Sequence, residues 1–159
     1  MGRTSPTLRF MTVFHATCIA FAEGAVLLRG PSGAGKSDLG LRLIDGGGLL
    51  VADDYVDLHL DGGALIARAP EKIKGLMEVR GLGLVPMATL DQAPLRLLVD
   101  LVPEDRMERM PEPSYETLMG LQLPLFALYA FEPSAAAKVR LAFARCLAST
   151  DLSHARHSL

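Results

Sequence analysis

Short apolar runs separated by glycine-, proline- and charge-rich turns recur along most of the chain, a pattern typical of a domain rich in strands. Glycine turns join neighbouring runs at two places, which predicts antiparallel hairpins over residues 8–28 and 56–69. The run at 49–52 does not alternate, as expected of a strand covered on both faces. The predicted strand regions are 8–22, 25–28, 49–52, 56–60, 64–69, 76–80, 96–102 and 121–131.

Two segments have helical periodicity. In residues 38–45 polar residues recur at three- and four-residue intervals, and leucines fill the other side. In residues 135–148 Val139 and Phe143 belong to one apolar stripe, and Ser134 is the expected N-cap. The predicted fold class is therefore α/β, with a mixed sheet, antiparallel hairpins and a C-terminal helix. We expect one domain over residues 1–159, with a frayed start at 1–6, a polar loop at 104–120 and a disordered tail at 149–159.

A glycine-rich loop follows the apolar run at 25–28 and precedes the first predicted helix. It fits G-x-x-x-x-G-K-[ST] at every fixed position, which predicts a cradle for nucleotide phosphates. Glycines let backbone N–H groups turn toward the phosphates, and a helix N-terminus adds a favourable field for anions. Lys36 is expected on the β- and γ-phosphates, and Ser37 on Mg²⁺. The predicted nucleotide-binding residues are Gly30, Pro31, Ser32, Gly33, Ala34, Gly35, Lys36 and Ser37.

Two adjacent carboxylates, Asp53 and Asp54, end the buried strand at 49–52. The end of a strand beside a phosphate loop is where α/β sheets collect ligands. One aspartate can hold Mg²⁺, and the other can accept a proton from a hydroxyl nucleophile or orient a water. A solvated turn with two acidic residues is the alternative interpretation.

Further polar residues are candidates on weaker grounds. His15 lies in the first strand region, where a structural histidine is the commoner case. His59 falls on the polar face of an alternating run and is expected at the surface. Glu78 and Arg80 share one face of the strand at 76–80, as a structural pair or as a metal ligand and a phosphate contact. Arginines in the segment 104–120 are compatible with phosphoryl-charge stabilisation or with a solvated surface.

Composition narrows the class of protein. The formal net charge is −2, so nothing favours bulk binding of nucleic acid. The two cysteines form no C-x-x-C pair, as suits a reducing compartment, and no apolar run approaches the length that spans a membrane. We therefore expect a cytoplasmic protein that binds neither nucleic acid nor membrane.

Together these motifs resemble the catalytic domain of the HPr kinase/phosphorylase family, over residues 8–148. The resemblance rests on His15 before the phosphate loop, on the strand ending in Asp53 and Asp54, and on two later segments. One is Glu-Val-Arg-Gly-Leu-Gly at 78–83, which is far more specific than a phosphate loop. The other is Glu-Asp-Arg at 104–106, a looser match.

The resemblance assigns roles to these residues. It implies a P-loop fold akin to phosphoenolpyruvate carboxykinase, with ATP and Mg²⁺ as cofactors. Asp54 would be the base that deprotonates a serine of the phosphocarrier protein HPr, and the acid in the reverse phosphorolysis. Glu78 would join Ser37 and Asp53 at the metal, while His15 and Arg106 would assist catalysis together with Lys36. Family members are typically homohexamers, so a homo-oligomer is expected.

Two departures from the family pattern qualify these expectations. Typical members carry a separate N-terminal domain, so this chain resembles a short form with the catalytic domain only. The residues at 130–134 contain neither the glycine nor the arginine of a family loop tied to dephosphorylation, which favours kinase over phosphorylase activity. A small-molecule P-loop kinase and a nucleotide-binding regulatory domain with little turnover are the alternative functions.

Overall fold

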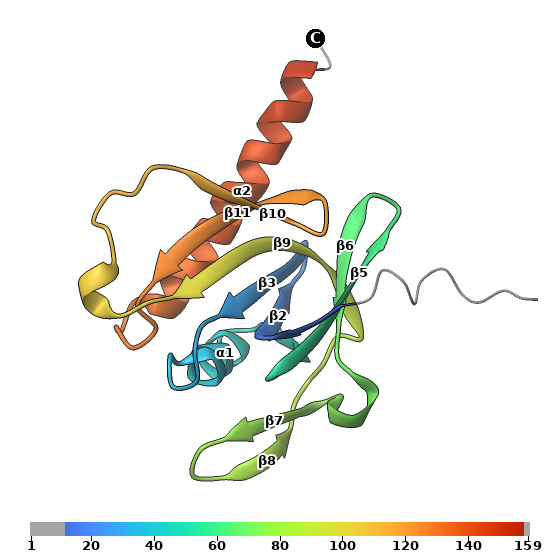
Figure 1. Ribbon diagram of the computed structural model, residues 1–159, viewed down its shortest axis with the longest axis vertical. Coiled ribbons are helices and arrows are strands. Elements are labelled where there is room, and N and C mark those ends of the chain that lie inside the picture. Colours follow the sequence, from blue (N-terminus) through green and yellow to red (C-terminus); the bar gives the residue numbers. More distant parts are fainter. Residues whose placement is uncertain (1–11, 158–159) are drawn as a thin grey trace, which may run out of the picture.

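A computed structural model describes residues 12–157, so the frayed start expected at 1–6 lies outside the described residues (Figure 1). Eleven strands and two α-helices make up this part of the chain, with short 3₁₀ turns at Glu71–Ile73 (η2) and Glu104–Arg106 (η3). The helices are α1 (Lys36–Asp45) and α2 (Ala135–His157). The strands are β1 (Thr12–His15), β2 (Thr17–Phe21), β3 (Gly24–Arg29), β4 (Leu49–Ala52), β5 (Tyr55–Asp61), β6 (Ala64–Arg68), β7 (Leu76–Val79), β8 (Gly83–Pro86), β9 (Gln92–Leu101), β10 (Ser114–Leu118) and β11 (Leu121–Leu128).

Nine of these strands form one mixed sheet, and β7 and β8 form a separate hairpin. The main path runs β1-β5-β6-β9-β3-β2-β4, and β11 also pairs with β9 and then with β10. Strands β3, β9 and β11 are mutually parallel, whereas the hairpin partners are antiparallel. Because the carboxyl ends of parallel strands share one edge of a sheet, the segments after β3, β9 and β11 emerge beside one another.

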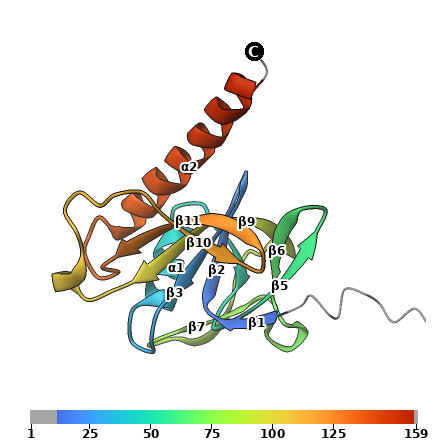
Figure 2. The same ribbon diagram turned by 45° about the horizontal axis from the view of Figure 1, so that its top comes forward.

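The core has two layers, one on each face of the central strands. Val26 and Leu28 of β3 face the helices, where they pack with Leu39 of α1 and Phe143 of α2. Leu27 points to the opposite face and packs with residues of β5, β6 and β9. Burial on both faces explains why the strand leading into the phosphate loop is a continuous apolar run. Both helices lie on one side of the sheet in Figures 1 and 2.

The predicted architecture is largely confirmed. The sheet is mixed, the hairpins β2–β3 and β5–β6 are antiparallel, and a C-terminal helix follows the last strand. No helix within residues 12–157 is both long enough and apolar enough to cross a bilayer.

Three expectations are wrong. The segment 104–120 contains β10, whose solvent face carries Tyr115 and Thr117, so a half-exposed strand there shows little apolar periodicity. Helix α2 continues to His157 instead of ending at 148, because the added residues include no proline or glycine that would break it. The described part of the expected tail is therefore helical. His59, which pairs with Ile66 of β6, is buried, with 8% exposed, so its alternation with apolar residues did not place it at the surface.

Candidate active site

The phosphate loop connects β3 to α1 and depends on two glycines with left-handed backbone conformations. Gly33 has φ 87° and Gly35 has φ 101°, in the region where side chains are disfavoured. A Cβ at Gly35 would also lie 2.8 Å from the Cβ of Ala130. The loop therefore approaches the segment after β11 so closely that only glycine fits at this position. Helix α1 begins immediately afterwards, at Lys36, so its N-terminal N–H groups open toward the loop.

Lys36 is held over the loop that precedes it. Its side-chain ammonium donates to the carbonyl oxygens of Gly30, at 2.6 Å, and of Pro31, at 3.2 Å. The residue is only 7% exposed, so its charge sits within the cradle and not in bulk solvent. An ammonium group has three N–H donors, and two carbonyl partners leave one for an anion in front of the loop.

Asp53 lies behind the loop as an acceptor of three hydrogen bonds. Its Oδ1 accepts from the hydroxyl groups of Thr17, at 2.9 Å, and Ser37, at 2.8 Å, and its Oδ2 accepts from the backbone N–H of Glu78 at 3.3 Å. The carboxylate is almost fully buried, with 6% of the residue exposed. A loop serine paired with an aspartate at a strand end is the arrangement that holds Mg²⁺ in P-loop enzymes.

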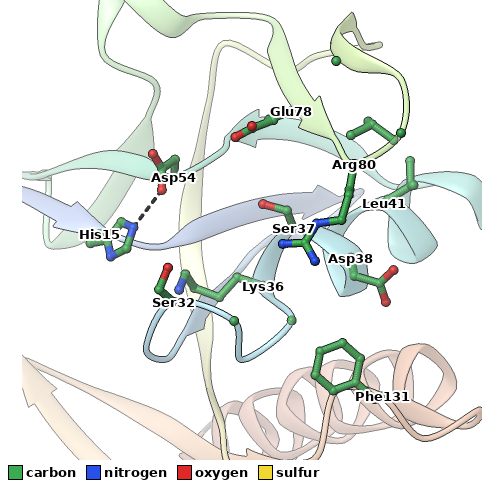
Figure 3. A pocket seen from close by; sticks show the side chains of 15 residues that line it. His15, Ser32, Lys36, Ser37, Asp38, Leu41, Asp54, Glu78, Arg80 and Phe131 are labelled. Carbon is green, nitrogen blue, oxygen red and sulfur yellow. Dashed lines mark hydrogen bonds and ion pairs between the residues drawn. The ribbon is translucent and has the colours of Figure 1, made fainter.

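The side chain of Asp54, unlike that of Asp53, is exposed to solvent. Its side chain is 59% exposed, and its backbone has φ 72°, which is uncommon for a residue other than glycine. His15 Nε2 lies 2.7 Å from Asp54 Oδ1, and because a carboxylate only accepts, the imidazole N–H is the donor (Figure 3). Strained backbone of this kind concentrates at functional sites. The ring of His15 also contacts that of Tyr55, with centroids 5.4 Å apart.

A cavity of about 610 Å³ joins these parts into one site. The β7–β8 hairpin contributes Glu78 and Arg80 to its wall, and the segment after β11 contributes Phe131. In Figure 3, His15 and Asp54 lie at one end of the cavity and Arg80 and Phe131 at the other, with the phosphate loop between them. The structure thus assembles groups that are far apart in sequence around a single phosphate cradle.

The predicted site residues differ in how they take part. The predicted residues that line the cavity are His15, Ser32, Gly33, Gly35, Lys36, Ser37, Asp54 and Glu78. Of the other predicted residues, Asp53 lies behind Ser37, and Gly30, Pro31 and Ala34 belong to the loop without lining the cavity. Arg106 is exposed on η3 and does not line it either.

No cluster of three or more histidine, cysteine or acidic side chains within the described residues is arranged to hold a metal ion by itself. Mg²⁺ is usually bound by one or two protein ligands together with waters and substrate phosphates. Asp53 and Ser37 already meet at the loop, and the backbone of Glu78 joins them. The residues present therefore fit the ion that the loop predicts.

Two residues of the site belong to no recognised sequence motif. Thr17 is a fully buried strand residue whose hydroxyl binds Asp53, and Phe131 is an aromatic residue just after β11. Neither has a sequence signal beyond its place next to a strand end. Their importance follows from the sheet order, which brings β2 and the end of β11 to the loop.

An ion-pair network supports the strand that feeds the loop. Arg29 is the residue before Gly30, and its guanidinium binds Asp100 of β9, at 2.7 Å, and Glu116 of β10, also at 2.7 Å. Arg29 donates hydrogen bonds to the carboxylate of Glu116, and this contact raises the pKa of Arg29 and lowers the pKa of Glu116. The end of β3 is thereby tied to two other strands of the sheet.

Fold and site together define a P-loop domain with an exposed, histidine-bound carboxylate in front of the phosphate cradle. The sequence family described as "HPr Serine kinase C-terminal domain" matches residues 7–127. This covers well over half of the chain, and the chain belongs to that family.

Known proteins agree with this assignment. A protein of Leptothrix cholodnii named "HPr kinase/phosphorylase" is 43% identical over 109 residues, which cover 60% of this chain and 34% of the relative. A protein of the same name from Burkholderia lata is 40% identical over 121 residues, covering 70% and 37%. The chain thus spans little more than a third of the length of these curated relatives.

A solved structure confirms the fold class. The structure of "the Hpr(Ser) kinase/phosphatase from Coxiella burnetii" superposes with a TM-score of 0.78 at 25% identity. The match covers 93% of this chain and 99% of that one.

Proposed function

We propose that this chain is an ATP- and Mg²⁺-dependent kinase that phosphorylates a serine of the phosphocarrier protein HPr. The observation that carries the proposal is the placement of Asp54. This exposed carboxylate is oriented by His15 and shares one cavity with Lys36 of the phosphate loop. The names of the relatives, which refer to HPr and to its serine, support the choice of acceptor.

The residues take roles that follow from their positions. The loop and Lys36 would bind the triphosphate of ATP, while Ser37 and Asp53 would hold Mg²⁺, with Glu78 beside them. When bound, Mg²⁺ neutralises charge on the phosphate oxygens. Asp54 accepts the proton of the serine hydroxyl as the serine oxygen bonds to the γ-phosphorus. The bond between that phosphorus and the β–γ bridging oxygen breaks, and ADP leaves.

His15 orients the carboxylate of Asp54 for this proton transfer. Its N–H is bound to Oδ1 of the carboxylate, which leaves Oδ2 without this hydrogen bond and available as the proton acceptor. The 59% exposure of the Asp54 side chain leaves room for a serine on the surface of another protein to approach. A buried base would admit only a small acceptor.

The test is transfer of labelled γ-phosphate from ATP to purified HPr by the full chain. Asp54→Asn keeps the size of the side chain but removes the base, so we expect a rate loss of at least about a hundredfold with ATP binding retained. Asp61→Asn, at the exposed β5–β6 turn, is the matched control and is expected to have wild-type activity.

Each contrary result would point to a particular error. Wild-type transfer by Asp54→Asn would show that another group is the base. ATP binding without transfer to HPr would favour one of the two alternatives, a small-molecule kinase or a regulatory domain. Release of the label from phospho-HPr on adding inorganic phosphate would show phosphorolysis as well. The roles of Arg106, the cytoplasmic location and the homohexamer stay predictions; light scattering after size-exclusion chromatography tests the last.

A further inference from the structure

We propose that Phe131 is the platform on which the base of the bound nucleotide stacks. This inference rests on the proposed function, because it takes the ligand of the phosphate loop to be a nucleotide. It adds a base subsite to the phosphate cradle and assigns it to the segment between β11 and α2.

Phe131 is an exposed aromatic residue in an unusual place. It is 51% exposed, yet it lines the same cavity as the phosphate loop. A Cβ at Gly35 would lie only 3.0 Å from Phe131 Cζ and 3.2 Å from its Cε1, so one edge of the ring rests against the loop backbone. Scattered exposed apolar residues need no explanation, but this one lies against the phosphate loop.

The ring is also held in place. Arg42 of α1 donates from its two terminal nitrogens to the carbonyl oxygens of Ala130 and Glu132, the residues on either side of Phe131. Tyr129 meets the ring edge-on, with centroids 5.8 Å apart. Lys138 of α2 holds the side chain of Glu132 at 2.5 Å. A half-exposed aromatic ring on a backbone pinned from both sides is a preorganised surface, which costs little entropy to use.

The direction of the nucleotide agrees with this position. Transfer requires the γ-phosphate near Asp54 and Lys36, and the α-phosphate then lies toward the N-terminus of α1. The ribose and base continue past that point, away from Asp54. Phe131 lies at that end of the cavity, together with Asp38 and Leu41 of α1 (Figure 3). A purine or pyrimidine there meets the phenyl ring of the cavity wall.

The experiment compares ATP with tripolyphosphate, which has the phosphates but no base, by titration calorimetry on the full chain. For Phe131→Ala we expect ATP affinity to fall about 5- to 150-fold, the range of base–aromatic stacking, with tripolyphosphate affinity unchanged. Equal losses for both ligands would mean that Phe131 only shapes the loop, and no loss for either would also overturn the inference.

A second variant covers the case in which Phe131→Ala disturbs the fold. The chain has no tryptophan, so Phe131→Trp introduces a single reporter that keeps an aromatic ring. ATP is expected to quench its fluorescence, and tripolyphosphate is not. The control is Leu141→Trp, on an exposed position of α2 outside the cavity, which neither ligand should affect. If both ligands, or neither, quench the fluorescence of the Phe131→Trp variant, base stacking is contradicted.

Failure of the inference and failure of the proposed function give different results. If the wild-type chain binds tripolyphosphate and ATP equally well, the phosphate cradle stands and the base subsite is refuted. If it binds neither, the proposed function fails and the inference fails with it. A Phe131→Ala variant with unchanged ATP binding but a raised KM for HPr would place the ring at the acceptor and overturn the inference.

Discussion

Replacing Thr17 by valine tests how the buried carboxylate of Asp53 is held in position. Valine has nearly the shape of threonine and suits a strand, so the change removes a hydroxyl donor without leaving a cavity. Asp53 would keep its bonds to Ser37 and to the N–H of Glu78, but Oδ1 would lose the 2.9 Å bond from Thr17. A hydrogen bond to a charged group contributes about 1.5–3 kcal/mol, and here both partners are buried.

We therefore expect Thr17→Val to lower the free energy of unfolding by about 1.5–3 kcal/mol, measured by urea denaturation. Thr117→Val makes the same substitution on the exposed face of β10 and should change stability by no more than about 0.5 kcal/mol. A second measurement, the Mg²⁺ dependence of ATP binding, tests whether Asp53 is still correctly positioned. The Mg²⁺ concentration for half-maximal ATP binding should rise about tenfold or more, as when a partner of a metal ligand is removed.

Thr17→Ser separates the hydroxyl from the methyl group. Serine keeps the donor but loses the methyl that packs toward Gly40, so we expect a stability loss of about 1 kcal/mol with wild-type Mg²⁺ dependence. If Thr17→Val kept both wild-type stability and wild-type Mg²⁺ dependence, the bond to Asp53 would be of no energetic consequence. If serine shifted the Mg²⁺ dependence as much as valine, packing and not hydrogen bonding would be the cause.

Two further predictions concern the loop and its support. Gly33→Ala has open space around the new Cβ and should lower the free energy of unfolding by about 1–2 kcal/mol because of its φ alone. Gly35→Ala adds the clash with Ala130, so we expect a larger loss of stability together with weaker ATP binding. Equal losses of stability for the two variants in urea denaturation would contradict this. Glu116→Gln should destabilise by about 1 kcal/mol near neutral pH. Because Arg29 lowers the folded-state pKa of Glu116, its contribution is present above the ordinary pKa of 4.5 and is lost as pH falls through the lowered value. Wild type and variant should therefore converge in acid, and a constant difference in urea titrations down to low pH would refute the role of the ion pair.

Local sequence patterns determined the phosphate loop and most elements of the sheet. The loop was predictable because glycine freedom and the start of a helix are decided by neighbours along the chain. Hairpins β2–β3 and β5–β6 were predictable for the same reason, since a short glycine turn leaves only one partner within reach. The position of Asp53 and Asp54 beside the loop was predictable because ligand sites in α/β sheets gather at the carboxyl ends of strands.

Segments with weak or misleading local patterns were predicted wrongly. Strand β10 has a solvent face of polar residues and is a strand because β11 pairs with it. His59 was expected at the surface because it alternates with apolar residues, yet it is buried and pairs with Ile66 of β6. For β10 the partner strand, which no local window contains, decided the outcome.

The sequence by itself thus predicted the phosphate-binding loop and its place between a strand and a helix, and only the tertiary structure decided what surrounds that loop. The contact between His15 and Asp54, the bond from Thr17 to Asp53 and the place of Phe131 beside Gly35 all join residues far apart in the chain. Such contacts depend on the order and direction of strands in the sheet. Many strand orders would bury the same apolar runs equally well, so hydrophobic pattern alone does not choose among them.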